Sequence, residues 1–182
     1  SIDTNLINAG AYVLERDVLE EMPAAGTNVS IERDVFPRLI GRGLFGHPSD
    51  GYWLDIGTPE RYLQGTFDIV LGAVETPVPV HRDGVLVLDG AQVAASAALG
   101  PNVVLWPGVS VGDRAVIERS VLLKGASVGA SCTVRDSILG PHARIGDECE
   151  LELAVLGEGT EIESGSKLEA GARIFPDVMS ER

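Results

Sequence analysis

The chain of 182 residues has few cysteines, few aromatic residues and few positive charges. Two cysteines are too few for the disulfide scaffold of a small secreted domain. With 14 basic and 27 acidic side chains the formal charge is −13, and this argues against nucleic-acid binding, because phosphate backbones are bound by clustered positive charge. Aromatic residues make up only 5%, so aliphatic and small side chains must fill the core.

Long apolar runs are also missing. No run approaches the roughly 20 residues that cross a bilayer, so we expect no membrane span. A basic segment followed by an apolar one is absent from the start, which predicts no secretory signal and favours a cytoplasmic protein. The sequence begins at Ser1 and enters a strand-like stretch almost at once. We interpret this start as a cut edge.

What the sequence does contain is a repeat over residues 87–174, whereas residues 1–80 show none. An aliphatic residue recurs every sixth position, and the step shortens to five at three places that are 17 residues apart. A small residue lies two positions before each aliphatic one; since alternate residues of a strand face the same side, both should point inward. The aliphatic series is Val87, Val93, Leu99, Leu105, Val111, Ile117, Leu122, Val128, Val134, Leu139, Ile145, Leu151, Leu156, Ile162, Leu168 and Ile174.

Glycine follows many of these aliphatic residues, directly or three places on, where the chain must turn a corner. This pattern resembles the hexapeptide-repeat family, which forms a left-handed parallel β-helix with three short strands per coil. About five coils are implied, and stacking at about 4.8 Å makes a prism about 24 Å long. Cys132 and Cys149 fall in the small inward positions, so we expect them to stack as buried fillers in adjacent coils. Trp106 occupies a glycine slot and should point outward.

The first part of the chain has a different pattern. Residues 6–14, 44–45 and 51–56 read as strands, residues 16–22 and 31–40 as helices, and a further helix begins at Thr58 with Pro59 in its first turn. We divide the chain into an α/β segment over residues 1–74, a linker over 75–84, the β-helix over 85–176 and a tail over 177–182. The first segment is too short for a complete α/β domain, which usually needs roughly 100 residues.

Three motifs precede the repeats in order: NAGAY at residues 8–12, SIERDVFP at 30–37 and GYWLDIGTPERY at 51–62. Together with the repeats they resemble the later part of the sugar-1-phosphate nucleotidyltransferases, and within that family the bacterial mannose-1-phosphate guanylyltransferases. The resemblance implies that residues 1–74 form the end of a Rossmann-like catalytic domain. It also implies the reaction of a sugar 1-phosphate with a nucleoside triphosphate, here mannose 1-phosphate and GTP, to give GDP-mannose and pyrophosphate.

The resemblance also assigns site residues. Asp55 would bind Mg²⁺ near the triphosphate, since hard magnesium prefers carboxylate oxygen, and Asn8, Ala9, Gly10 and Glu32 would lie at the sugar. Other interpretations stay open at this point. Asp55 could instead cap the helix that begins at Thr58, the Asn8–Gly10 segment could be only a strand-end turn, and Glu32 could only support the first turn of its helix.

The chain departs from the family in one large respect. It contains neither the glycine-rich signature with its arginine nor the glutamate-lysine-proline segment. We therefore expect the chain to be inactive alone. The β-helix would then serve regulation or the assembly of a homo-oligomer. The alternatives are glucose-1-phosphate thymidylyl or adenylyl transfer, a non-catalytic assembly or regulatory subunit and, least favoured, a hexapeptide acyltransferase. That last class uses a catalytic histidine, and His142 has no evident acidic partner in the sequence.

Overall fold

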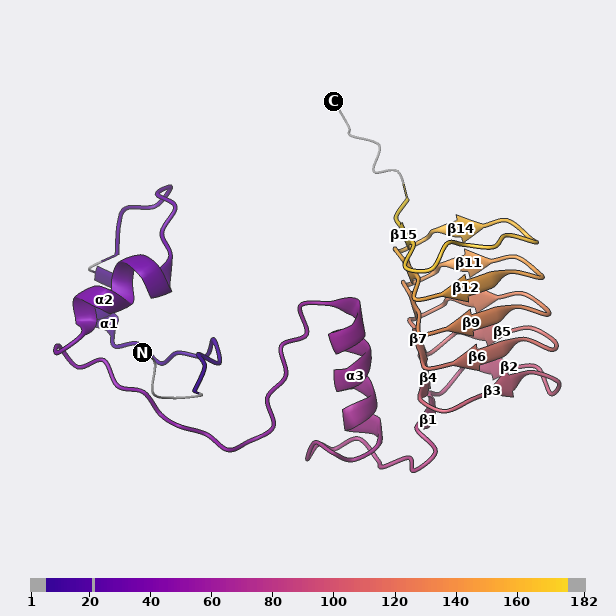
Figure 1. Ribbon diagram of the computed structural model, residues 1–182, viewed down its shortest axis with the longest axis horizontal. Coiled ribbons are helices and arrows are strands. Elements are labelled where there is room, and N and C mark those ends of the chain that lie inside the picture. Colours follow the sequence, from indigo (N-terminus) through magenta and orange to yellow (C-terminus); the bar gives the residue numbers. More distant parts are fainter. Residues whose placement is uncertain (1–5, 21, 177–182) are drawn as a thin grey trace. The chain divides into compact units, whose positions relative to one another are not determined.

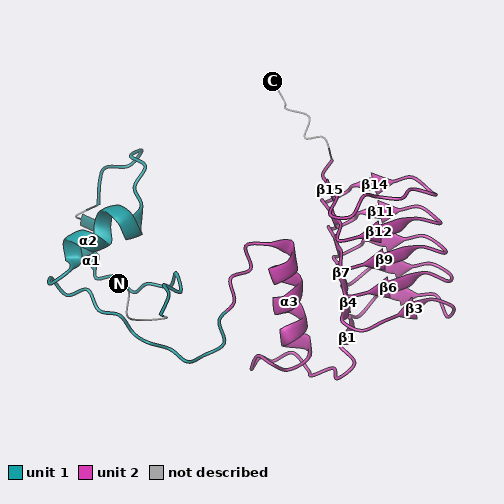
Figure 2. Ribbon diagram, viewed as in Figure 1, with its two compact units in different colours: residues 1–53 teal, residues 54–182 magenta. Residues whose placement is uncertain are grey.

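The computed structural model describes residues 6–20 and 22–176 and is shown in Figure 1. The chain divides into two compact units, Ser1–Trp53 and Leu54–Arg182 (Figure 2). The tail expected over residues 177–182 lies outside the described residues. None of the described helices has both the length and the apolar character that a membrane span requires.

The second unit contains a parallel β-helix whose strands stack as separate layers (Figure 1). Fifteen short strands in the described residues form three sheets, and strands next to each other in a sheet come from successive coils. Sheet A consists of β1 (Val85–Val87), β4 (Val103–Leu105), β7 (Ser120–Leu122), β10 (Ile138–Leu139), β13 (Val155–Leu156) and β15 (Arg173–Ile174). Sheet B consists of β2 (Gln92–Val93), β5 (Ser110–Val111), β8 (Ser127–Val128), β11 (Arg144–Ile145) and β14 (Glu161–Ile162). Sheet C consists of β3 (Ala98–Leu99), β6 (Val116–Glu118), β9 (Thr133–Arg135) and β12 (Glu150–Glu152).

The core of the β-helix is the predicted double series of inward side chains. In the middle coils both the aliphatic and the small positions are almost fully buried, as Ile117 and Ala115 illustrate at 0% exposure. Val87 belongs to the same series but is 43% exposed, because it lies in the first coil and only one neighbouring coil covers it. Cys132 and Cys149 are free, buried and stacked, and the amide of Cys149 donates to Sγ of Cys132 at 3.4 Å. The predicted phase of the repeat is therefore confirmed.

The corner glycines have two different roles, where the sequence suggested one. Glycines three places after the aliphatic residue, such as Gly125 and Gly159, have positive φ, which a glycine adopts without strain. Glycines directly after it, such as Gly112 and Gly129, have no positive φ. A Cβ on Gly112 would instead lie 2.7 Å from the carbonyl carbon of Gly129 in the next coil. These glycines allow close approach of adjacent coils, and the corner itself does not require glycine at them.

Helix α3 (Pro59–Val70) packs on the outer face of sheet A, beside which it runs in Figure 1. Its buried residues Leu63, Phe67 and Val70 recur at helical spacing and form one cluster with sheet residues. Those sheet residues stand in register in four successive strands; they are Leu86, Val104, Val121 and Ile138. Twelve helical residues span about 18 Å, enough to cover four strands about 4.8 Å apart.

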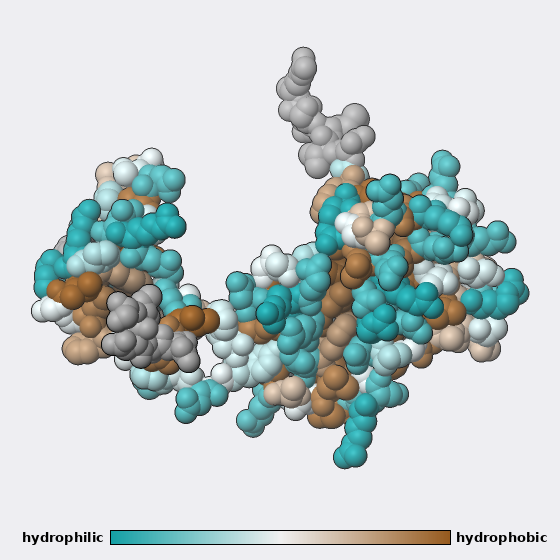
Figure 3. Space-filling model, viewed as in Figure 1, coloured by the Kyte–Doolittle hydropathy of each residue, from teal (hydrophilic) through white to brown (hydrophobic). Residues whose placement is uncertain are grey.

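The outer faces of the other two sheets are polar. Sheet B carries the ion pair Arg144–Glu161 at 2.7 Å and sheet C the pair Glu118–Arg135 at 2.8 Å. An apolar column runs beside α3 along sheet A in Figure 3. The helix therefore lies on the sheet face with apolar outward positions, where burial removes the most apolar surface from water.

The first unit contains α1 (Arg16–Glu20), a wide turn of π-helix (Ile31–Val35) and α2 (Phe36–Leu39). Ser30 caps the second of these by accepting a hydrogen bond from the amide of Arg33 at 3.2 Å, as its position predicts. The strands predicted over residues 6–14, 44–45 and 51–56 are not formed in the described residues. A strand needs a neighbouring strand to satisfy its backbone, and these segments have none. The Rossmann-like character expected for this part is therefore not seen.

Candidate functional site

Three polar side chains of the first unit form a closed triangle. Nδ2 of Asn8 donates to the Tyr12 hydroxyl at 2.6 Å and to Oε1 of Glu32 at 2.8 Å. The Tyr12 hydroxyl donates to the same Oε1 at 2.6 Å. Two residues that the sequence assigned to a sugar site, Asn8 and Glu32, are therefore brought together, and Tyr12 joins them.

Local chain geometry builds this triangle. The amide of Gly10 donates to Oδ1 of Asn8 at 2.9 Å, which closes a turn, and Gly10 has φ of +74°, so glycine suits the position. This turn brings Asn8 and Tyr12 to the same side. The Asn8–Gly10 segment therefore forms a turn, although not at the end of a strand, and this turn orients the Asn8 amide for the triangle.

The opposite side of the triangle comes from the turn that Ser30 caps. Glu32 lies in its first turn, and the Ser30 amide donates to Oδ2 of Asp34 at 2.8 Å. The Tyr12 ring stands edge-on to the Phe36 ring with centroids 4.8 Å apart, which is a favourable aromatic geometry. The ring contact and the hydrogen bonds together fix the Tyr12 side chain.

The triangle has a defined electrostatic state. The hydrogen bond from the Tyr12 hydroxyl to Glu32 raises the pKa of Tyr12 above the ordinary value for tyrosine. The hydrogen bond from Asn8 to that hydroxyl acts in the other direction. Tyr12 is therefore a protonated donor at neutral pH. Oε1 of Glu32 accepts both hydrogen bonds, and its partner oxygen Oε2 takes no part in the triangle. Because these side chains are exposed to solvent, Oε2 can accept from a hydroxyl-bearing ligand.

Two further residues of the same motifs were missed in the sequence. Tyr12 could have been found because it stands in NAGAY, two residues after Gly10. Trp53 lies in GYWLDIG, and its indole Nε1 donates to the carbonyl of Ala9 at 3.3 Å. The backbone carbonyl of Ala9 is therefore held by the Trp53 side chain, a contact between residues 44 positions apart.

Asp55, the expected magnesium ligand, belongs to the second unit. Its Oδ1 accepts a hydrogen bond from the amide of Gly57 at 2.9 Å. The helix cap is Thr58, whose hydroxyl oxygen accepts from the amide of Arg61 at 3.3 Å. The alternative that Asp55 caps α3 is therefore wrong.

The residues around Asp55 offer a metal one carboxylate rather than a cage. Within residues 6–20 and 22–176, no group of three or more His, Cys, Asp or Glu side chains gathers as a metal site. Mg²⁺ is commonly held by one or two carboxylates together with substrate phosphates and water. The exposed Asp55 carboxylate fits that mode, in which the phosphates complete the coordination.

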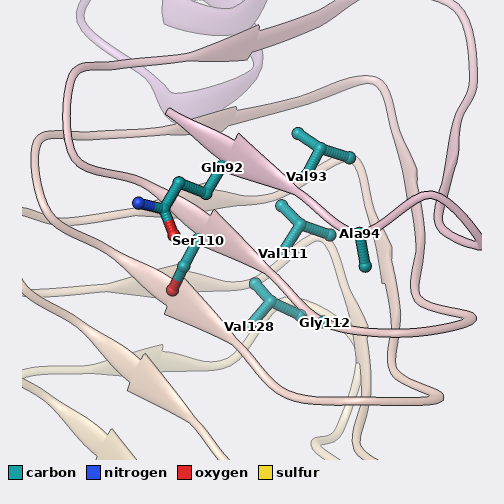
Figure 4. Close-up of a pocket in the computed structure, with 7 residues that line it drawn as sticks. All are labelled: Gln92, Val93, Ala94, Ser110, Val111, Gly112 and Val128. Atoms are coloured by element: carbon teal, nitrogen blue, oxygen red, sulfur yellow. The ribbon is translucent and has the colours of Figure 1, made fainter. Parts of the chain in front are cut away.

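A hollow of about 360 Å³ lies on the β-helix and is shown in Figure 4. It is lined by Gln92, Val93, Ala94, Ser110, Val111, Gly112 and Val128. The polar side chains among these are the Gln92 amide and the Ser110 hydroxyl. None of these lining side chains is an acid or a base, so this hollow supplies no group for acid–base catalysis.

Comparison with known proteins places the chain in a family. A family model described as the GMPPB C-terminal domain matches residues 81–178. The mannose-1-phosphate guanylyltransferase of Mycobacterium tuberculosis is 39% identical over 123 residues, which cover 65% of this chain and 34% of that protein. The mannose-1-phosphate guanyltransferase of Debaryomyces hansenii is 36% identical over 128 residues, covering 65% and 34%. The protein named "Probable mannose-1-phosphate guanylyltransferase 1" from Oryza sativa subsp. japonica is 35% identical over 121 residues, covering 65% of this chain and 33% of that protein.

Among solved structures, the acetyltransferase domain of PglB from Neisseria gonorrhoeae is 20% identical, with a TM-score of 0.40 over 52% of each chain. This likeness is too low to carry an argument about function. The parallel β-helix of hexapeptide repeats and the family match define the class: a protein with the C-terminal domain of the mannose-1-phosphate guanylyltransferases. The chain belongs to the GMPPB C-terminal domain family, and it spans about a third of the length of the curated relatives that it matches.

Proposed function

We propose that this chain supplies the C-terminal portion of a mannose-1-phosphate guanylyltransferase, which forms GDP-mannose and pyrophosphate from mannose 1-phosphate and GTP. The observation that carries the proposal is the 39% identity over 123 residues to a protein of that name. In this proposal the first segment is the end of a Rossmann-like domain, and the repeats coil with a left hand. Because the chain spans about a third of its relatives, we expect it to be inactive without the remaining part.

Each site residue receives a role in this proposal. Glu32 and Asn8, together with the backbone at Ala9 and Gly10, would bind hydroxyl groups of the sugar phosphate. Support comes from the triangle, in which Asn8 and Tyr12 hold one oxygen of Glu32 and leave the other for a ligand. Asp55 would hold Mg²⁺, which neutralises phosphate charge as the reaction proceeds. The chain's own contribution there is to orient the carboxylate through Gly57.

The β-helix would serve assembly, with a second copy of the chain as its partner. Support comes from the two ends of the coil stack, where apolar side chains stay exposed: Val87 at 43% and Phe175 at 63%. Open strand edges favour association, and soluble oligomers are mostly symmetric assemblies of identical chains. Deleting residues 81–182 from the full-length protein should abolish its oligomers in sedimentation analysis; oligomers that survive the deletion would contradict this role.

A direct assay tests the enzymatic proposal. The 182-residue chain and the full-length protein are each given mannose 1-phosphate, GTP and MgCl₂, and pyrophosphate release is measured. We expect activity in the full-length protein alone, a loss of at least about 100-fold in Asp55→Asn and Glu32→Gln, and no change in the surface variant Glu163→Ala.

The same assay separates the alternatives. Faster turnover of glucose 1-phosphate with dTTP or ATP would reassign the sugar and the base. Transfer from acetyl coenzyme A without pyrophosphate release would instead indicate an acyltransferase. A full-length protein that oligomerises but uses none of these substrates would be an assembly or regulatory subunit, and it would refute the enzymatic proposal.

A further inference from the structure

Helix α3 contains a glycine in its interior, Gly65, which ordinary helix energetics disfavours. Glycine destabilises a helix interior relative to alanine because it loses more backbone freedom on folding. The backbone of Gly65 does not require it, since its φ is not in the positive range. The reason must therefore lie in what surrounds the missing side chain.

That space is taken by two side chains from the segment before the helix. A Cβ at position 65 would lie 3.2 Å from Cδ2 of Leu54 and 3.5 Å from Cγ2 of Ile56. The first of these distances is tighter than ordinary van der Waals contact. Gly65 therefore forms a notch on α3 in which Leu54 and Ile56 pack.

Asp55 stands between these two residues. A Cβ at position 65 would meet Leu54 and Ile56 within 4 Å but no atom of Asp55, so the side chain between them lies outside the notch. Asp55 is exposed, and its carboxylate also holds the Gly57 amide, directly before the Thr58 cap. The segment is thus fixed on the helix through both neighbours of Asp55 and through the turn that follows.

The helix, in turn, is fixed on the β-helix. Phe67 and Val70 are buried in one cluster with Val104 and Val121 of sheet A. Buried side chains therefore join the coils of the β-helix to α3, and the two residues that flank Asp55 lie against α3 at Gly65.

We propose that Gly65 is a positioning residue: its notch seats residues 54–57 on α3, so that the β-helix determines where the Asp55 carboxylate stands. The inference deepens the proposed function and rests on it in one respect, the role of Asp55 in catalysis. It gives the repeats a part in the chemistry beyond assembly, because changes in the packing of α3 on sheet A would move Asp55.

The packing of residues 54–57 against Gly65 is tested first by a measurement that does not depend on enzymatic activity. In the 182-residue chain with labelled methyl groups, nuclear Overhauser contacts should join the α protons of Gly65 to the methyl groups of Leu54 and Ile56. Gly65→Leu should abolish them for residues 54 and 56 and shift both methyl resonances. Gln64→Leu, which adds the same side chain at the exposed neighbouring position, should leave the resonances in place. Absence of the contacts in the unmodified chain would overturn the proposal.

The consequence for catalysis is tested in the full-length enzyme. Gly65→Leu should raise the Mg²⁺ concentration for half-maximal rate about tenfold and leave KM for mannose 1-phosphate within about twofold. Rescue gives the decisive control: Leu54→Ala removes the atom that a new side chain meets, so the double variant should regain most of the Mg²⁺ affinity. If the double variant needs as much Mg²⁺ for half-maximal rate as Gly65→Leu does, the proposed notch is wrong.

Two further outcomes keep the inference separate from general stability and from the proposed function. If Gly65→Leu fails to fold, Gly65→Ala replaces it. Helix propensity alone favours alanine, so a higher Mg²⁺ concentration for half-maximal rate in a more stable helix supports the notch, and an unchanged concentration overturns it. If Asp55→Asn is fully active, the role of Asp55 under the proposed function fails, and the methyl contacts alone decide whether Gly65 seats the segment.

Discussion

Glu60, in the first turn of α3, lies 3.6 Å from Arg173 of β15, measured from Oε1 to Nη2. At the other end of the helix the carbonyl of Val70 accepts a hydrogen bond from the amide of His81, just before the first coil. The N-terminal end of the helix therefore faces toward the last coil, and its C-terminal end lies at the first coil. The pKa of Glu60 lies below its ordinary value, chiefly because its own backbone amide and the Thr58 hydroxyl donate to it, with a smaller contribution from Arg173.

Removing the central anchor of α3 should free the helix and leave the β-helix folded. Phe67 is 8% exposed in the cluster with sheet A, and Phe67→Ala should cost about 3 kcal/mol or more of docking energy. We expect rapid proteolysis within residues 72–84 and an unchanged melting transition of the repeats. The matched change Gln64→Ala, at an exposed position, should leave the cleavage rate as it is. Equal cleavage rates in the two variants would contradict the packing described here.

The inward phase of the repeat predicts a sharp contrast between two substitutions. Val128 is 3% exposed inside the coils, so Val128→Asp buries an unpaired charge and should cost about 4 kcal/mol or more. Glu163 is exposed, and Glu163→Ala should change stability by no more than about 0.5 kcal/mol. Thermal unfolding of both variants checks the contrast; equal shifts would mean that the phase is wrong.

One corner column should respond in opposite directions to glycine gain and glycine loss. Glu148 has φ of +57° and Gly165, in the next coil of the same column, has φ of +75°. Glu148→Gly should stabilise by about 0.5 kcal/mol, because relief of left-handed strain exceeds the added freedom of the unfolded chain. Gly165→Ala should destabilise by about 1 kcal/mol, although a Cβ there meets open space.

Urea unfolding measures both effects in this corner column. Glu148→Gln serves as the control, since it removes the charge and keeps the side chain. If Glu148→Gln stabilises as much as Glu148→Gly, relief of charge repulsion rather than of backbone strain is the cause.

The buried thiol of Cys132 should be inert in the folded chain. Burial raises the pKa of Cys132 above that of an ordinary thiol. In a Cys149→Ala variant, where Cys132 is the single thiol, a thiol reagent should react at pH 8 at least about 100-fold more slowly than in urea. Rapid reaction without denaturant would show that the coil opens at this level.

The same shift predicts a pH dependence of stability. Because the folded-state pKa is raised, the unfolded chain loses the thiol proton first as pH increases. The contribution of Cys132 is therefore unaffected below the unfolded pKa of about 8.5, and stability declines as pH rises from there toward the folded value. Cys132→Ala should remove this decline, which urea unfolding at pH 7 and pH 9.5 measures.

Removing the Tyr12 hydroxyl should loosen the proposed sugar site without removing its acceptor. Tyr12→Phe keeps the ring against Phe36 and deletes the hydrogen bond to Glu32. In the full-length enzyme we expect KM for mannose 1-phosphate to rise about fivefold, with kcat within about twofold, in keeping with about 1 kcal/mol for a hydrogen bond to a positioned group. An unchanged KM would place the sugar elsewhere.

Much of the β-helix could be predicted from local pattern, because each coil repeats the same short-range rules. The positions of Ile117, Cys132 and Trp106 followed from period and phase, and the structure places them inward, inward and 42% exposed. The helix starts at Ser30 and Thr58 were also readable, because a cap is a contact between residues three apart in sequence. The three motifs named the Asn8–Glu32 pair through a resemblance, without showing how the two residues meet.

The sequence by itself thus determined the coils, their inward residues and the helix caps, since these depend on neighbours within one coil or one turn. The tertiary structure decided what depends on contacts across many residues: α3 on the outer column of sheet A, the notch at Gly65, and the Asn8–Tyr12–Glu32 triangle. The strand register aligns the outward apolar residues, among them Val104 and Val121, into that column. The strands expected in the first unit are absent for the same physical reason. A strand depends on a partner, and hydrophobic pattern alone does not supply one.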